Sequence, residues 1–111
     1  MSYSIIIPIH NEVESLPALL ERLQPYSQNN EIIIIDDGSN DQSYRLLQRC
    51  SFITLIHFQT NLGKGKAICT GLEKATHEQI ILFDGDLELN LQEISKFMIL
   101  NKTERIHVVF G

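Results

Sequence analysis

Short apolar runs alternate along this chain with longer segments in which apolar residues recur at helical spacing. The runs are too short for ordinary helices and contain many isoleucines, which is typical of strands buried on both faces of a sheet. They lie at residues 3–9, 31–35, 52–58, 80–83 and 106–110. The segments between them predict amphipathic helices over residues 11–23, 41–50, 67–75 and 90–98. This alternation predicts an α/β fold, a Rossmann-like parallel sheet with helices on both faces.

Length and composition limit the class of protein. With 111 residues and 43% hydrophobic content, the chain is expected to form a single domain. The formal net charge of -5 argues against general binding to nucleic acid or to anionic membranes, because both need a basic surface. Cys50 and Cys69 lie in different predicted helices without Cys-x-x-Cys spacing, and we interpret them as reduced thiols. The sequence shows neither a signal peptide nor a membrane span, so a cytoplasmic location is expected.

Acidic residues follow two of the predicted strands at the point where each strand ends. Asp36 and Asp37 follow the second strand, and the fourth is followed by Asp84, Asp86 and Glu88. In a sheet of this kind ligands bind beyond the carboxyl ends of the strands, so both groups can share one edge. Carboxylates at such short range repel each other unless a cation or hydrogen-bond donors offset their charge. Asp84, Asp86 and Glu88 are therefore predicted to bind a divalent metal ion.

Two further loops are expected at the same edge, and each has a structural as well as a functional interpretation. The Asp-Asp-Gly-Ser segment at 36–39 is ordinary turn chemistry, but Asp37 could also accept a hydrogen bond from the base or ribose of a nucleotide. Residues 61–66 lack the Gly-x-x-x-x-Gly-Lys-Ser/Thr pattern. Lysines beside a helix N-terminus could nevertheless hold a phosphate or a sugar hydroxyl, and a solvated turn is the alternative.

The Asp84-Gly85-Asp86 triplet taken alone could also be a surface turn. Its position after a fully apolar strand, with a second acid pair on a neighbouring loop, favours a role in binding a metal and a nucleotide. Histidines are scattered along the chain, and a lone histidine is more often structural than a ligand. Only His10, beside Glu12 at the end of the first strand, is placed to line a site.

Four motifs together resemble the family 2 glycosyltransferases, and they occur in the family's order. They are Pro8-Ile9-His10-Asn11-Glu12, Ile35-Asp36-Asp37-Gly38-Ser39 with Asp41, Asn61-Leu62-Gly63-Lys64-Gly65, and Asp84-Gly85-Asp86-Leu87-Glu88. The last resembles the family's metal-binding acid-x-acid motif. Its Asp-Leu-Glu ending is most similar to the branch that uses polyprenyl phosphates as acceptors, as dolichyl-phosphate mannose and glucose synthases do. The resemblance covers nearly the whole chain and implies the nucleotide-binding half of a GT-A fold.

The resemblance also implies which residues bind the donor, a UDP-sugar or a GDP-sugar. The residues bordering its base, ribose or diphosphate would be Pro8, His10, Glu12, Ile35, Asp37, Lys64, Asp84 and Gly85. Asp86, with Asp84, would bind Mg or Mn. The charges agree with this assignment, because an acidic edge would repel a diphosphate unless a divalent ion bridged the carboxylate and phosphate oxygens.

The activity implied is metal-dependent, inverting transfer of the sugar to an acceptor, with a polyprenyl phosphate as one candidate. Family members continue past a strand like the one at 106–110, and that later part holds the acceptor site and a carboxylate resembling a general base. The resemblance therefore assigns no catalytic residue within these 111 positions, and the general base is expected beyond Gly111.

We accordingly expect residues 1–111 to be one nucleotide-sugar-binding domain that is truncated at its carboxyl end, either as a fragment or as a natural short form. A full-length form would act in the cytoplasm or at the cytosolic face of a membrane. Self-association is plausible for a fragment with exposed strand edges.

Two alternatives of other classes remain at this point. The chain could be a non-catalytic nucleotide-binding or interaction module of the same fold. A phospho-receiver domain is also a small doubly wound sheet with carboxylates and a metal. That domain places its acids after the first and third strands, whereas here they follow the second and fourth, which disfavours it.

Overall fold

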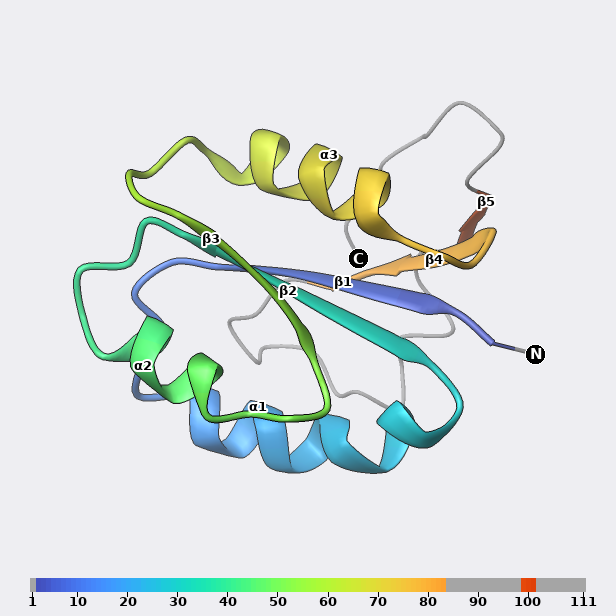
Figure 1. Cartoon of the computed structure of the whole chain (residues 1–111), viewed down its shortest axis with the longest axis horizontal. Helices are drawn as coiled ribbons and strands as arrows, with labels where there is room; N and C mark the ends of the chain where they lie inside the picture. The colour runs from blue at the N-terminus through green and yellow to red at the C-terminus, as the bar shows by residue number, and fades with distance from the viewer. Residues whose placement is uncertain (1, 84–98, 102–111) are drawn as a thin grey trace.

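The computed structural model describes residues 2–83 and 99–101. The elements follow one another as β1 (Ser4–Ile9), α1 (Leu16–Leu23), the 3-10 helix η1 (Gln24–Gln28), β2 (Glu31–Asp37), α2 (Ser43–Gln48), β3 (Thr54–Phe58), α3 (Lys64–Lys74), β4 (Gln79–Leu82) and β5 (Ile99–Asn101). Figure 1 shows a central sheet with α1 and α2 below it and α3 above it. The expected α/β fold with helices on both faces is confirmed. None of the helices in the described ranges is long and apolar enough to cross a membrane.

The first four strands form a parallel sheet in the spatial order β3-β2-β1-β4. In its register Ile6 of β1 lies beside Ile33 of β2 and Leu82 of β4. Strands are added on one side of β1 as far as β3 and then on the other side from β4 onward. The direction of winding therefore reverses between β1 and β4. In open α/β sheets ligands bind at such a reversal, beyond the carboxyl ends of the strands.

A short antiparallel strand at the edge of the sheet was not expected from the sequence. β5 pairs with β4, with Ile81 opposite Ile99. Three residues are too few to show a periodic pattern, and an antiparallel edge on an otherwise parallel sheet is a common arrangement. The helix predicted over residues 90–98 and the strand predicted over 106–110 lie outside the described residues.

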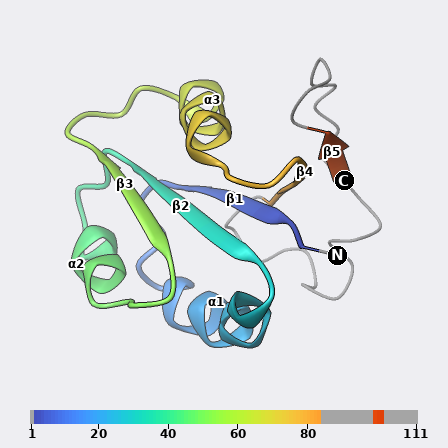
Figure 2. The same ribbon diagram turned by 45° about the vertical axis from the view of Figure 1, so that its right-hand side comes forward.

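Alternation of side chains along the strands divides the core into two layers. The layer between the sheet and helices α1 and α2 contains Ile5, Ile7, Ile9, Leu16, Leu19, Leu23, Ile32, Ile34, Leu47, Ile81 and Phe83. The layer beneath α3 contains Ile6, Ile33, Ile35, Ala67, Ile68, Leu72, Ala75, Ile80 and Leu82. Figure 2 shows the sheet running between the two helical layers. The isoleucine runs of β1 and β2 are thus buried on both faces, as their lack of polar residues predicted.

Helix α3 approaches the sheet closely at Gly71. A Cβ atom on this glycine would lie 2.6 Å from Cγ2 of Ile6 and 2.9 Å from Cδ1 of Ile35. Real Cβ atoms essentially never come within 3.0 Å of a neighbour, so a side chain here would force α3 or the side chains of Ile6 and Ile35 to shift. The absence of a side chain at this position therefore sets the spacing between α3 and the strands that carry the candidate site.

The beginnings of two helices differ from expectation, and both differences affect the site. Helix α1 begins at Leu16 and not at residue 11, because Asn11 adopts a left-handed φ of 52°. Residues 11–15 consequently form a loop at the end of β1. Helix α3 begins at Lys64, directly after Gly63, whose φ is 103°. Lys64 and Lys66, predicted to lie in a loop, belong to the first turn of this helix.

The amino ends of the strands are tied together by a polar cluster around Ser4, which is fully buried. Its Oγ donates a hydrogen bond to Oε1 of Glu31 at 2.6 Å and accepts one from the backbone N–H of His77 at 3.2 Å. The backbone N–H of Thr76 donates to the same Glu31 oxygen at 2.8 Å. Burial by itself raises the pKa of Glu31. The hydrogen bonds from Ser4 and Thr76 and the nearby His77 have a larger effect in the opposite direction, so the pKa of Glu31 lies below its ordinary value. The cluster joins β1, β2 and the segment between α3 and β4.

Candidate functional site

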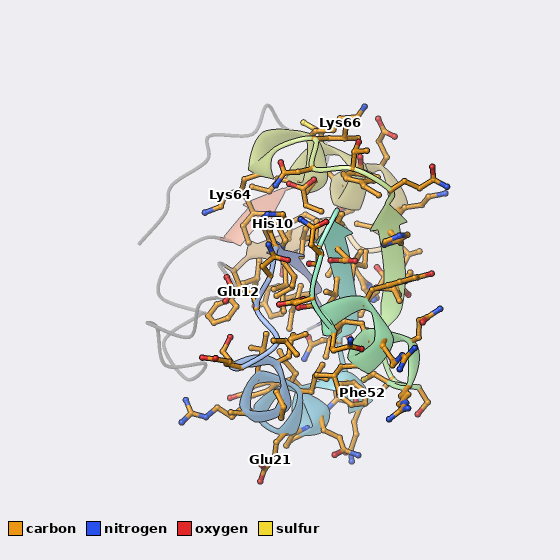
Figure 3. All side chains as sticks on the ribbon, turned by 90° about the vertical axis from the view of Figure 1, so that its left-hand side faces the viewer. His10, Glu12, Glu21, Phe52, Lys64 and Lys66 are labelled. Carbon is orange, nitrogen blue, oxygen red and sulfur yellow. The ribbon has the colours of Figure 1, made fainter. Side chains whose placement is uncertain are left out.

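The loops that follow β1, β2 and β3 meet at the carboxyl edge of the sheet. Figure 3 looks toward this edge and shows His10, Glu12 and Lys64 on one side of the molecule, with Lys66 extending away at the top. His10 and Glu12 belong to the loop after β1, and Lys64 begins α3. Three of the polar side chains that the sequence predicted at this edge therefore lie at it.

Asp36 and Asp37 end β2 and are both buried, with 0% and 4% of their surface exposed. Adjacent residues of a strand point to opposite faces of the sheet, so the two carboxyl groups serve different neighbours. Asp37 lies on the α3 side, where Oδ1 accepts a hydrogen bond from the N–H of Leu62 at 2.7 Å and Oδ2 from that of Gly63 at 3.0 Å. The carboxyl group of Asp37 thus holds the loop that leads into α3.

Asp36 lies on the other face and pairs with a histidine. Its Oδ2 is 2.9 Å from Nδ1 of His57 on β3, and its Oδ1 accepts a longer bond of 3.4 Å from the N–H of Ser39. The ring of His57 stacks on that of Tyr44 in α2, with centroids 3.7 Å apart and 11° between the planes. No pattern in the sequence predicted this pairing. Only the assignment of β2 and β3 as neighbouring parallel strands in register could have suggested it.

His10 is held by two hydrogen bonds within the edge. Its Nδ1 lies 2.7 Å from the backbone carbonyl oxygen of Asp37, and its Nε2 lies 3.3 Å from Nδ2 of Asn11. A carbonyl oxygen only accepts, so Nδ1 carries the hydrogen. Nε2 is then the acceptor for the amide of Asn11. The orientation of this amide follows in turn, because Oδ1 of Asn11 accepts the N–H of Asn40 at 2.7 Å.

The left-handed Asn11 and the tight turn at Gly38 bring these loops into contact. The backbone N–H of Asn11 donates to Oγ of Ser39 at 2.9 Å, joining the loop after β1 to the loop after β2. Gly38 has a φ of 67°, and a Cβ atom placed on it would lie 2.3 Å from the backbone N of Asn61 and from the backbone carbon of Thr60. Only glycine fits between the loops after β2 and β3.

A polar cleft of about 340 Å³ opens beside the start of α1, lined by residues 11–15 and Asp41. Asp41 accepts hydrogen bonds from the backbone N–H groups of Val13 at 3.2 Å and Ser43 at 2.8 Å. Burial by itself raises the pKa of Asp41. The hydrogen bonds from Ser43 and Val13 lower it by more, so the pKa of Asp41 lies below its ordinary value. The N–H of Glu12 donates to Oγ of Ser43 at 3.1 Å, and Oε2 of Glu12 accepts a bond from Ser15. This cleft is fixed between the loops after β1 and β2.

The remaining residues predicted for the donor and metal sites divide into two groups. Pro8 and Ile35 are both buried within their strands. Asp84, Gly85 and Asp86 lie outside the described residues. Across residues 2–83 and 99–101, no group of three or more His, Cys, Asp or Glu side chains is placed to hold a metal ion.

The expected catalytic base likewise lies outside the described residues. The family resemblance places this group beyond Gly111, and Gly111 itself lies outside residues 2–83 and 99–101. The same holds for the carboxyl-terminal boundary of the domain predicted over residues 1–111. Both therefore stay predictions, and no catalytic role is assigned to a residue of the described edge.

The sheet order, the reversal between β1 and β4 and the polar carboxyl edge define a Rossmann-like α/β domain of the GT-A type. Residues 4–111 match the family model described as glycosyl transferase family 2, and the chain belongs to that family.

Curated relatives include the undecaprenyl-phosphate 4-deoxy-4-formamido-L-arabinose transferases of Proteus mirabilis and Aeromonas hydrophila. They are 36% and 38% identical to this chain over 104 residues. Each match covers 86% of this chain and 32% of the relative. The chain therefore spans about a third of the length of the curated relatives it matches.

Several solved structures share the fold. Residues 1–349 of S. aureus TarS match with a TM-score of 0.72 and 24% identity, over 86% of this chain and 31% of that one. The same TarS segment in complex with UDP matches with a TM-score of 0.69 and 26% identity, over 78% of this chain and 28% of that one. The mannosyltransferase PcManGT of Pyrobaculum calidifontis, in complex with GDP-Man and Mn²⁺, matches with a TM-score of 0.68 and 24% identity, over 76% of this chain and 27% of that one.

Proposed function

We propose that this chain is the donor-binding part of a glycosyltransferase that moves a sugar from a nucleotide sugar to a polyprenyl phosphate, assisted by Mg or Mn and with inversion. The observation that carries the proposal is the placement of Asp37, at the carboxyl edge of the sheet, between the loop bearing His10 and the loop that leads into α3, which begins at Lys64. Membership of glycosyl transferase family 2 supports the reaction class.

Asp37 and His10 would bind the nucleoside end of the donor. Each oxygen of the Asp37 carboxylate accepts one backbone N–H and keeps a second lone pair, with which it can accept a hydrogen bond from a base N–H or a ribose hydroxyl. UDP in a TarS complex and GDP-Man in the PcManGT complex indicate the two nucleotides to test. Both hydrogen bonds of the His10 ring are internal, so its ring faces are what it offers to a ligand.

The diphosphate and the metal would lie between Lys64 and the end of β4. Asp84 and Asp86 would supply the carboxylate oxygens that Mg and Mn prefer, and Mn²⁺ is present in the PcManGT complex. Asp84 and Asp86 would hold the divalent ion, which when bound would supply positive charge to stabilise the departing nucleoside diphosphate. Lys64, at the start of α3, would add positive charge on the same side.

The named relatives suggest undecaprenyl phosphate, or a similar lipid phosphate, as the acceptor. A phosphate monoester is ionised at neutral pH, so its oxygen can attack the anomeric carbon without a general base. The bond from that carbon to the diphosphate breaks, and the electron pair leaves with the nucleoside diphosphate. A single displacement of this kind inverts the configuration at the anomeric carbon. The general base expected beyond Gly111 would then be needed only for a hydroxyl acceptor.

Calorimetric titration of the chain with UDP, GDP and their sugar conjugates, each with and without Mn²⁺, tests the donor site. We expect one nucleotide to bind in a metal-dependent manner. Asp86→Ala should remove the part of the affinity that depends on Mn²⁺, whereas Asp37→Ala should weaken binding with and without the metal. Glu21→Ala, which removes an exposed carboxylate from the outer surface of α1, is the matched control and should bind as the unmodified chain does. Full metal-dependent affinity in Asp86→Ala would refute the metal assignment.

A further inference from the structure

His57 lies on β3, at the edge of the described sheet and outside every motif that indicated the donor site. Its Nδ1 is 2.9 Å from Oδ2 of Asp36, a side chain with no exposed surface. A carboxylate only accepts hydrogen bonds, so Nδ1 is the donor. Tyr44 covers one face of the ring by stacking at 3.7 Å. His57 is therefore fixed in one orientation by two neighbours from different elements.

A continuous set of hydrogen bonds leads from His57 to the loop after β1. Asp36, held by His57, accepts the N–H of Ser39 at 3.4 Å. Oγ of Ser39 accepts the N–H of Asn11 at 2.9 Å, and the amide of Asn11 in turn donates to Nε2 of His10 at 3.3 Å. Each bond links one member of the set to the next, and the set ends at His10, the residue proposed to border the nucleoside.

We propose that His57 is a positioning residue for the donor site, acting through Asp36 on the turn at Ser39 and through it on Asn11 and His10. This inference rests on the proposed function, because the readout is nucleotide binding. The physical reason is the burial of Asp36. Buried polar groups need hydrogen-bond partners, and without His57 this carboxyl group loses its 2.9 Å bond and keeps the 3.4 Å bond from Ser39. The carboxyl group would turn toward water, and the turn at Ser39 would move with it.

Substitutions at His57 separate positioning from simple packing. His57→Leu removes the donor, and His57→Asn keeps an N–H close to the position of Nδ1 while it removes the ring. His77→Leu is the matched control: it makes the same chemical change in the segment before β4, at the amino ends of the strands. The dissociation constant of the nucleotide that the unmodified chain binds is measured with Mn²⁺, well below the unfolding temperature of every variant. Backbone amide resonances of Ser39 and Asn11 are recorded for the same proteins.

We expect His57→Leu to weaken nucleotide binding about tenfold, the loss typical of one hydrogen bond to a charged group. His57→Asn should stay within about threefold of the unmodified chain, and His77→Leu should be unchanged. In an Asp36→Asn background, His57→Leu should add little further loss, because the two residues act through one bond. Unchanged affinity in His57→Leu, or equal losses in His57→Leu and His57→Asn, would overturn the proposal.

The positioning role of His57 can also be tested if the unmodified chain binds no nucleotide or if His57→Leu does not fold. If the unmodified chain binds none of the nucleotides, the proposed function fails, and the amide resonances decide this inference alone. Shifts at Ser39 and Asn11 in His57→Leu but not in His77→Leu then support positioning, and their absence overturns it. If His57→Leu does not fold, His57→Gln replaces it, because its amide lies one methylene farther along than that of asparagine. It should bind less tightly than His57→Asn, and equal affinity would count against the proposal.

Discussion

The turn at Gly38 allows a sharp test of how the loops at the carboxyl edge hold one another. In Gly38→Ala the new Cβ would lie 2.3 Å from the backbone of Thr60 and Asn61, whereas ordinary contact begins at 3.4 Å. The loop after β3 must therefore retreat by about 1 Å to accommodate a methyl group. Such a shift would stretch the 2.7 Å bond from Leu62 to Asp37 beyond hydrogen-bonding range.

The expected cost has two parts. Alanine at a φ of 67° costs about 1 to 2 kcal/mol relative to glycine. Losing one hydrogen bond to a charged acceptor costs about 1.5 to 3 kcal/mol more. The free energy of unfolding should thus fall by about 4 kcal/mol, a large share of the 5 to 15 kcal/mol of a typical domain. Since the clash involves backbone atoms, rotation of a side chain cannot relieve it.

Two other glycines separate strain from clash. Gly63 has a φ of 103° but no atom within 4 Å of its virtual Cβ, so Gly63→Ala should cost only the conformational strain, about 1 to 3 kcal/mol. Gly65 has neither feature and lies in the first turn of α3, so Gly65→Ala should leave stability unchanged or raise it by up to about 1 kcal/mol.

Urea unfolding followed by circular dichroism measures all three variants beside the unmodified chain. With a typical slope of about 1 to 3 kcal/mol per molar urea, Gly38→Ala should unfold at a midpoint lower by more than about 1 M. Gly65→Ala should have the highest urea midpoint, Gly63→Ala an intermediate one and Gly38→Ala the lowest. A midpoint for Gly38→Ala equal to that of Gly63→Ala would show that the loop yields without loss, and the argument from close approach would then be wrong.

The other predictions concern the amino end of the sheet and the packing of α3 against the sheet. Because hydrogen bonds lower the pKa of Glu31 in the folded chain, its contribution to stability is present above the ordinary glutamate pKa of about 4.3 and is lost as the pH falls through the folded value. The urea midpoint should drop on acidification below that value, and Glu31→Gln should show a smaller drop; an identical pH profile would exclude Glu31 as the cause. Gly71→Val should destabilise the chain by about 1 to 3 kcal/mol or more, since its Cβ alone meets Ile6 at 2.6 Å. Thr70→Val, a nearly isosteric change at a half-buried neighbour on the same helix, is the control, and equal urea midpoints for these two variants would contradict the close packing of α3.

Local patterns predicted most of the fold, and they failed where contacts between distant segments set the boundaries. The isoleucine runs of β1 and β2 and the stripe of Ala67, Ile68 and Leu72 in α3 required nothing beyond periodicity and burial. The start of α1 was wrong by five residues, 11 against 16. Asn11 is a good N-cap by type, but its contacts with Ser39 and Asn40 hold it in a left-handed conformation. A local sequence pattern cannot predict a hydrogen-bond partner that lies 28 or 29 residues away.

The amino-acid order alone predicts the α/β class of this chain and the acidic and basic groups that follow its strands. It does so because the apolar pattern of a strand and the residue types of a turn are local properties. The motifs of its family are present there in order as well. What each polar group does at the edge of the sheet depends on tertiary structure. Asp36 and Asp37 are adjacent in sequence, yet the alternation of the strand and the order of the sheet send one to His57 and the other to the loop before α3. The partner that each carboxyl group meets depends on which strands lie side by side, and the packing of the whole sheet determines that order.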